Sequence, residues 1–205
     1  MKMTDMKRTL FYLTAAVCLL AGCSRTQKFT VSGELAATGL PANTKTIQLI
    51  SEGLPLPIEA AVTDGTFSME GEVAKPVLAK LISDSKDQNR FPALILEKGA
   101  VTFEEGRPVG TPLNDENKAF IEQLRAIRKE NADNRAASDK ATEEAYSAFV
   151  AKHKNDPCAV FAILLADQRL APEFILQLIS AASPEIQNIG EVRSLAERMK
   201  KKTVK

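Results

Sequence analysis

The sequence has few of the residues that most often carry chemistry. Its 205 residues include three cysteines and a single histidine, His153. No Cys-x-x-Cys pair is present, which excludes dithiol redox chemistry by this chain alone. The sequence also has no phosphate loop, no Gly-x-Gly-x-x-Gly, no Gly-x-Ser-x-Gly elbow and no His-Glu-x-x-His. We therefore expect a chain that is not an enzyme and that needs no cofactor.

The single histidine does not predict a metal site. Such a site needs several ligands, and we find no cysteine or carboxylate cluster at ligand spacing around His153. The residue instead continues an apolar stripe made by Tyr146, Phe149 and Val150. We expect it at the C-terminal end of a helix, where the helix dipole favours a positive charge.

The chain also carries almost no net charge. Its 27 basic and 26 acidic residues give +1 at pH 7. This balance leaves no basic footprint for nucleic acid, so we expect no nucleic-acid partner. Attachment to a membrane would have to come from a lipid anchor rather than from a basic surface.

The N-terminal residues 1–22 predict an export signal. Lys7 and Arg8 precede an uncharged run, Thr9 to Gly22, that is too short to span a bilayer as a stable helix. A basic start, a short apolar middle and small residues before the cut are typical of bacterial export signals. The sequence Leu-Ala-Gly-Cys at residues 20–23 also resembles the lipobox of bacterial lipoproteins. That resemblance implies cleavage before Cys23 and acylation of its thiol; the alternative is an ordinary secreted protein with a cysteine at the cleavage site.

The lipobox resemblance implies where the mature chain lies. A chain of residues 23–205 would be held in the cell envelope by the lipid on Cys23, with the membrane as its partner. An Asp directly after Cys23 would favour inner-membrane retention, and an acidic run would favour export to the cell surface. The sequence has neither feature after Cys23. We expect the outer membrane, facing the periplasm.

Cysteine use then leaves one free thiol. Cys18 is removed with the signal and Cys23 is acylated, so Cys158 has no partner for an intramolecular disulfide. Cys158 follows Pro157 at a predicted helix N-terminus, where the dipole lowers a thiol pKa. It is therefore a candidate reactive thiol. The interpretation that we favour is a small buried residue on an apolar helix.

Residues 23–110 predict an antiparallel β module. Apolar and polar residues alternate in short segments between turn residues, the pattern of strands with one buried face. About seven such segments within about 80 residues favour a β-sandwich or an open barrel. They are residues 29–35, 47–49, 58–62, 67–73, 77–82, 93–96 and 101–103. Asp64-Gly65 is the strongest hairpin signal, because both central residues of a type I′ turn need positive φ.

Residues 111–205 predict a helical region, so the expected fold class is α+β. Thr111 and Pro112 suit the cap and first position of a helix. Residues 158–166 are apolar nearly all round, which predicts a buried helix. A last helix is expected to carry a stripe from Ile186 to Met199. The expected starts of the helices after the first are Ser138, Pro157, Pro172 and Ser183-Pro184.

Four segments in this order resemble one known module. They are Phe29-Thr-Val-Ser-Gly33, Val62-Thr-Asp-Gly-Thr-Phe-Ser-Met-Glu-Gly71, Leu94-Ile-Leu-Glu-Lys-Gly99 and Gly110-Thr-Pro-Leu-Asn114. They resemble the domain of unknown function that precedes the thioredoxin-like domain in lipid-anchored thiol-disulfide oxidoreductases of Gram-negative bacteria. In that family the stretch similar to residues 195–205 leads into a thioredoxin fold. The present sequence stops there, so the resemblance carries over no catalytic residue.

The resemblance implies a non-catalytic accessory module that works beside a thioredoxin-like partner, docking to it or presenting substrates to it. A second hypothesis is a stand-alone envelope lipoprotein that binds a peptide or a glycan. It predicts a concave apolar pocket with a few convergent polar groups. A third hypothesis, direct catalysis by Cys158 alone, is the least favoured.

Overall fold

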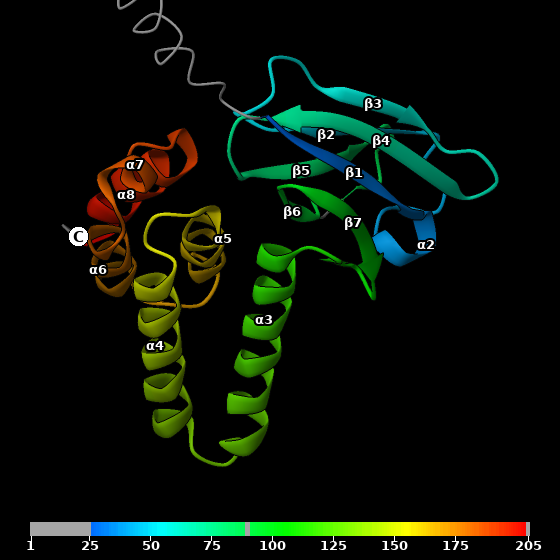
Figure 1. Cartoon of the computed structure of the whole chain (residues 1–205). Helices are drawn as coiled ribbons and strands as arrows, with labels where there is room; N and C mark the ends of the chain where they lie inside the picture. The colour runs from blue at the N-terminus through cyan, green and yellow to red at the C-terminus, as the bar shows by residue number, and fades with distance from the viewer. Residues whose placement is uncertain (1–25, 89–90, 204–205) are drawn as a thin grey trace, which may run out of the picture.

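The computed structural model describes residues 26–88 and 91–203, which form a β region followed by a helical region (Figure 1). The fold class is α+β, as the sequence predicts. The predicted export signal, residues 1–22, and the predicted lipidation site Cys23 lie outside the described residues. Within the described part of the chain, no helix is both long and apolar enough to cross a membrane.

Two four-stranded sheets make up the β region. The first sheet has the order β4-β1-β7-β8 and the second has the order β3-β2-β5-β6. Neighbouring strands are antiparallel except β1 and β7, which are parallel. The strands are β1 (Gln27–Glu34), β2 (Thr46–Ile50), β3 (Ile58–Ala61), β4 (Thr66–Val73), β5 (Val77–Ser83), β6 (Ala93–Leu96), β7 (Gly99–Glu104) and β8 (Arg107–Val109).

The two sheets pack face to face as a β-sandwich. Alternate residues of most strands point into one shared core, for example Val31 and Met69 from the first sheet and Ile47 and Leu81 from the second. Three of these four side chains have no exposed surface and the fourth is 3% exposed. Burial of one such side chain is worth about 1.5–3 kcal/mol, so the predicted period-two pattern accounts for the packing of the two layers.

The Asp64-Gly65 turn forms as predicted, but its two strands separate. Asp64 has φ 51° and Gly65 has φ 75°, and Thr63 and Thr66 exchange two backbone hydrogen bonds across the turn. Beyond that bridge, β3 pairs with β2 in the second sheet while β4 pairs with β1 in the first. The turn therefore passes the chain from one layer of the sandwich to the other.

Two further details of the β region differ from the sequence prediction. Leu35, which was expected at the end of a strand, begins a short helix α2 (Leu35–Thr38) that Gly39 ends with φ 76°. The strand β8 was not expected. It has three residues, too few for an alternating pattern, and it follows a tight turn at Glu105-Gly106 in which both residues have positive φ.

Six helices follow the sandwich among the described residues. They are α3 (Pro112–Glu130), α4 (Arg135–Lys152), α5 (Pro157–Ala166), α6 (Pro172–Ala181), α7 (Pro184–Gln187) and α8 (Gly190–Thr203). Helices α3 and α4 run side by side as a long hairpin (Figure 1). Proline occupies the first turn of α3, α5, α6 and α7, where its missing N–H costs nothing.

Two helix boundaries depart from the sequence prediction. Helix α4 begins at Arg135 rather than after Ser138, because the Asn134 side chain accepts a hydrogen bond from the Ala137 N–H at 3.1 Å and caps the helix earlier. The single helix expected from Pro184 onward is two helices, α7 and α8, which are separated at residues 188–189. The apolar stripe continues through that break, so the stripe alone could not reveal it.

The helices form a second core around α5. This helix is buried along most of its length, as its apolar sequence predicts. The Phe120 ring stacks on Phe149 with centroids 4.1 Å apart and meets Tyr146 edge-on at 5.0 Å. Ile95 of β6 belongs to this core, so the second sheet supplies the surface on which the helices pack.

Candidate functional site

At one end of the contact between the second sheet and the helices, Asn114 of α3 forms hydrogen bonds with the backbone of β6. Its side-chain amide accepts from the Ile95 N–H and donates to the Ile95 C=O, both at 2.8 Å. It also donates to the Thr111 hydroxyl at 2.7 Å. Asn114 has no exposed surface. It therefore takes the place of a neighbouring strand along β6, whose backbone groups would otherwise be buried without partners.

The residues around Asn114 hold α3 in the same place. The Leu113 N–H donates to the Glu97 carboxylate at 2.7 Å, and the Gly110 N–H donates to the Asp115 carboxylate at 3.0 Å. Gly110 has φ 94°, and a Cβ there would lie 2.7 Å from the Ala100 carbonyl oxygen. The segment Gly110–Asn114, which carries part of the family resemblance, is thus the joint between the sandwich and the helices.

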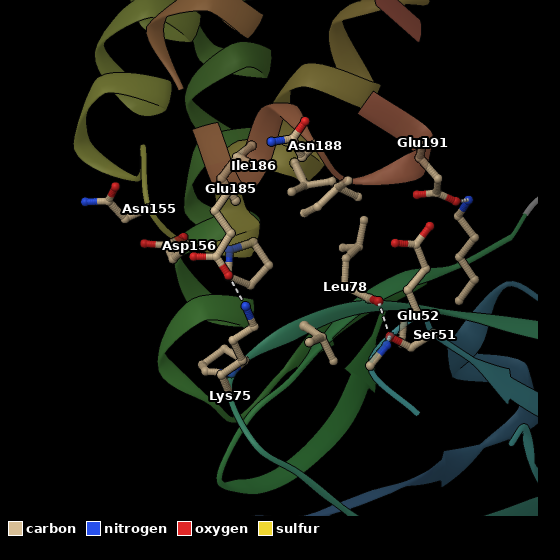
Figure 2. Close-up of a pocket in the computed structure, with 18 of the residues that line it drawn as sticks. Ser51, Glu52, Lys75, Leu78, Asn155, Asp156, Glu185, Ile186, Asn188 and Glu191 are labelled. Atoms are coloured by element: carbon tan, nitrogen blue, oxygen red, sulfur yellow. Dashed lines mark hydrogen bonds and ion pairs between the residues drawn. The ribbon is translucent and has the colours of Figure 1, made fainter. Parts of the chain in front are cut away.

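The other end of the same contact opens into a cleft of about 700 Å³ (Figure 2). Strand β5 and the end of β2 form its floor, and the start of α5, helix α7 and the start of α8 form its roof. We call this space the sheet–helix cleft. Its lining residues are Ile50, Ser51, Glu52, Gly53, Lys75, Pro76, Val77, Leu78, Ala79, Lys80, Asn155, Asp156, Pro157, Val160, Glu185, Ile186, Asn188, Ile189 and Glu191.

The centre of the sheet–helix cleft is aliphatic. Leu78 and Ile50 come from the sheet, Val160 and Ile186 come from α5 and α7, and Ile189 comes from the connection between α7 and α8. Ile50 is 36% exposed, one of the few large apolar side chains that remain open to solvent in the described residues. The Ser51 hydroxyl donates to the Leu78 carbonyl at 2.7 Å, so its proton is not available to a ligand in the cleft (Figure 2).

Two ion pairs cross the sheet–helix cleft. Lys75 pairs with Glu185 of α7, and Lys80 pairs with Glu191 of α8. Lys75 lies in the bend before β5 and Lys80 lies within β5, so the two pairs cross the cleft at separate places. All four side chains are more than one-third exposed, so each pair is worth about 0–1 kcal/mol. The cleft is therefore bridged by contacts that open at little cost.

The charges of the lining are unequal. Four carboxylates, those of Glu52, Asp156, Glu185 and Glu191, face two lysines. Ser51 is the only hydroxyl among the described lining residues, and its proton is already used. Aliphatic surface with a surplus of negative charge is suited to holding an apolar chain that bears a basic group.

Cys158 does not reach the surface of the cleft. It has no exposed surface, and burial beside the Asp156 carboxylate raises the pKa of its thiol. Its Sγ donates to the Leu113 carbonyl at 3.5 Å, and its N–H donates to Asp156 at 2.9 Å. Burial here outweighs the helix dipole that the sequence analysis considered, which favours the interpretation of Cys158 as a core residue over a reactive thiol.

His153 lies at the C-terminal cap of α4, as expected, but it has neighbours that the sequence analysis did not recognise. Its Nδ1 lies 2.9 Å from an Asp156 carboxylate oxygen, and its Nε2 lies 3.7 Å from a Glu116 oxygen. One ligating atom each from His153, Asp156 and Cys158 lie within 4.8 Å of one another. The spacing His-x-x-Asp-x-Cys was the available signal, and it spans a helix end, a tight turn and a helix start.

A second hollow, of about 480 Å³, lies beside the turn between β7 and β8. Its lining is charged throughout: Glu104, Glu105, Arg107, Lys118, Glu122 and Arg125. Burial and the nearby Arg125 lower the pKa of the Arg107 guanidinium. Acidic and basic groups are equal in number here, so this hollow selects a ligand less clearly than the sheet–helix cleft does.

Comparison of the chain with protein-family models, with curated proteins and with solved structures finds no match.

Proposed function

We propose that the chain is a lipid-anchored, non-catalytic binding module of the cell envelope, and that it holds a peptide segment in the sheet–helix cleft. The observation that carries this proposal is the cleft itself, a concave aliphatic surface crossed by two exposed ion pairs. Cys23 supplies the anchor in this proposal. The localisation, in the outer membrane facing the periplasm, belongs to the same proposal and is supported by residues 24–28, which have no Asp at the second position and no acidic run.

A peptide suits the cleft better than a glycan does. The described lining has aliphatic side chains and contains no aromatic ring on which a sugar could stack. The surplus of carboxylates favours a peptide in which a lysine or arginine flanks an apolar stretch.

A second candidate function is an accessory module for a thioredoxin-like oxidoreductase, in which the bound peptide is a segment of that partner or of its substrate. Support comes from the places of the four resembling segments. The second of them forms the crossover turn and most of β4, and the last, Gly110–Asn114, forms the joint at α3. Both segments therefore have defined structural roles in this chain, one at the crossover between the sheets and one at the start of α3.

The test is a mild-detergent pull-down of the tagged full-length lipoprotein from its native envelope, with bound proteins and peptides identified by mass spectrometry. The cleft variant is Ile50→Glu, which replaces an aliphatic side chain of the lining by a charged one, and so removes apolar contact with the peptide, at a position that is already 36% exposed. The matched control is Leu56→Glu, which makes the same change at a 74% exposed residue outside the lining.

We expect the wild type and Leu56→Glu to retain the same peptides or protein, and Ile50→Glu to lose them. Enrichment of a thioredoxin-like protein that depends on Ile50 would support the accessory function. A peptide without a redox partner would support the stand-alone binding module. Equal recovery by all three proteins would show that the cleft is not the binding surface.

The anchor is tested separately with Cys23→Ser. We expect this variant to lose the mass of the acyl chains and to leave the membrane fraction, because a chain with almost no net charge is only weakly attracted to an anionic membrane surface. A variant that stays membrane-bound and keeps its lipid would contradict the proposal of lipidation at Cys23.

A further inference from the structure

We propose that His153, Asp156 and Cys158 form a binding site for a zinc ion, with Glu116 positioning the imidazole. The three proposed ligands come from the short connection between α4 and α5: the C-terminal cap of α4, the N-terminal cap of α5 and the first turn of α5. Nitrogen, oxygen and sulfur ligands in one cluster are the set that Zn²⁺ binds in proteins. The proposal does not depend on a peptide occupying the sheet–helix cleft.

The separations of the three ligating atoms are close to those of a zinc site. They lie within 4.8 Å of one another, and Nδ1 of His153 lies 2.9 Å from Asp156. Zinc bonds of about 2.0–2.3 Å in a tetrahedron require ligand atoms about 3.3–3.8 Å apart. Binding therefore needs shifts of about 1 Å, which side-chain rotations on fixed helix ends can supply.

The second observation is the unpaired nitrogen of His153. The residue is 5% exposed, and its Nε2 is buried without a hydrogen-bond partner. When Nδ1 binds a metal, the ring proton moves to Nε2 and points toward the Glu116 carboxylate, 3.7 Å away. Lys152 holds that carboxylate through contacts of 2.8 and 2.7 Å. A carboxylate that receives the outer N–H is the usual support of a metal-binding histidine.

Charge and access also favour a cation. The thiolate of Cys158 and the carboxylate of Asp156 together balance the two charges of Zn²⁺, and the proton of the thiol leaves to solvent when the sulfur–zinc bond forms. Asp156 is the one ligand that lines the sheet–helix cleft, and its side chain is 33% exposed. It provides the entry route, and the fourth position of the tetrahedron would face the cleft and take water.

The test uses the purified full-length lipoprotein in mild detergent, with Co²⁺ as a spectroscopic probe and Zn²⁺ as competitor. We expect one Co²⁺ per chain, an intense near-ultraviolet band from the cobalt–thiolate bond, and loss of that band when Zn²⁺ is added. Asp156→Asn keeps the helix cap and removes one ligand, so it should weaken Co²⁺ binding at least 10-fold. Cys158→Ala should abolish the thiolate band.

Glu116→Gln tests the positioning role. It removes the charge that receives the Nε2–H, and we expect metal affinity to fall about 10–100-fold while the thiolate band of the saturated protein stays unchanged. Asp139→Asn, a similar change at an exposed site on α4, is the control and should bind like the wild type. Circular dichroism of each variant separates loss of metal binding from loss of fold. Absence of the thiolate band in the wild type, or metal binding that Asp156→Asn leaves unchanged, would overturn the proposal.

Discussion

The two ends of the contact between the second sheet and the helices differ in how they treat polar groups. At the β6 end, Asn114 and Glu97 are buried, and their side chains form hydrogen bonds with backbone groups of Ile95 and Leu113. At the β5 end, the lysines and glutamates that cross the cleft remain exposed. The first end fixes the sandwich on the helices, whereas the exposed ion pairs at the second end cost little to break. This difference supports the proposal of a binding surface at the β5 end.

The largest loss of stability is expected from substitution of Asn114 at the β6 end. Asn114→Ala removes three hydrogen bonds and leaves the Ile95 N–H and C=O buried without partners. We expect the free energy of unfolding to fall by about 3 kcal/mol, because each unpaired backbone group costs about 1–3 kcal/mol. Urea unfolding followed by circular dichroism measures the change.

Asn131→Ala is the matched control for Asn114. It removes one amide at the other end of the same helix, where the side chain donates a single bond to the Ile127 carbonyl at 2.8 Å. We expect a loss of about 0.5–1 kcal/mol. Equal losses at the two positions would show that the β6 end is not a special point of attachment.

Gly110 gives the next largest effect. At φ 94° an added Cβ lies 2.7 Å from the Ala100 carbonyl oxygen, so Gly110→Ala should cost about 2 kcal/mol through strain in the joint. Gly65→Ala at φ 75° has no atom within 4 Å of the added Cβ and should cost about 1 kcal/mol. Thermal unfolding should rank the two variants in that order, and the reverse order would contradict the role of Gly110.

Much of the secondary structure could be predicted, because strands, turns and helix starts depend on residues that are close in the sequence. The alternation at Ile47 and Leu49 gives a strand with one buried face, and Asp64-Gly65 gives the turn. The pairing of β4 with β1 depends on a strand more than thirty residues earlier in the chain. No local pattern specifies that choice, so the divergence of β3 and β4 could not be predicted.

The candidate site was less predictable than the fold. The sequence marks Asn114 only as the last residue of the Gly110–Asn114 segment, since a buried amide that completes a sheet edge follows no sequence period. The sheet–helix cleft joins a loop after β2 to helices more than one hundred residues away. His153, Asp156 and Cys158 meet across a turn, where neither the helical nor the strand period relates positions. Their association therefore needs the three-dimensional structure.

Tyr146, in the core of the helical region, is a buried polar residue that contrasts with Asn114. Its hydroxyl is buried without a hydrogen-bond partner, unlike the amide of Asn114. Tyr146→Phe should leave stability unchanged or raise it by up to about 1 kcal/mol. Burial raises the pKa of Tyr146 to about 12, above its usual value near 10.

The raised pKa also predicts a pH effect. The unfolded chain ionises Tyr146 near pH 10, whereas the folded chain keeps it neutral until about pH 12. The stability that the neutral buried ring contributes is thus complete below pH 10 and is lost as the pH rises from 10 toward 12. Tyr146→Phe should lose less stability over that window, and identical pH profiles for the two proteins would contradict this explanation.

The smallest effects are expected at the ion pairs that cross the sheet–helix cleft. Lys75→Ala and Lys80→Ala should each lower the free energy of unfolding by about 0.5 kcal/mol, and the loss should shrink further in 1 M salt. A double-mutant cycle of Lys75→Ala with Glu185→Ala measures the pair itself. A coupling energy near zero would mean that the ion pair does not stabilise the contact between sheet and helices, which would then rest on the aliphatic side chains of the cleft. A coupling as large as the loss at Asn114 would mean that both ends of the contact are fixed, and the cleft could then admit a peptide only by breaking a structural bond.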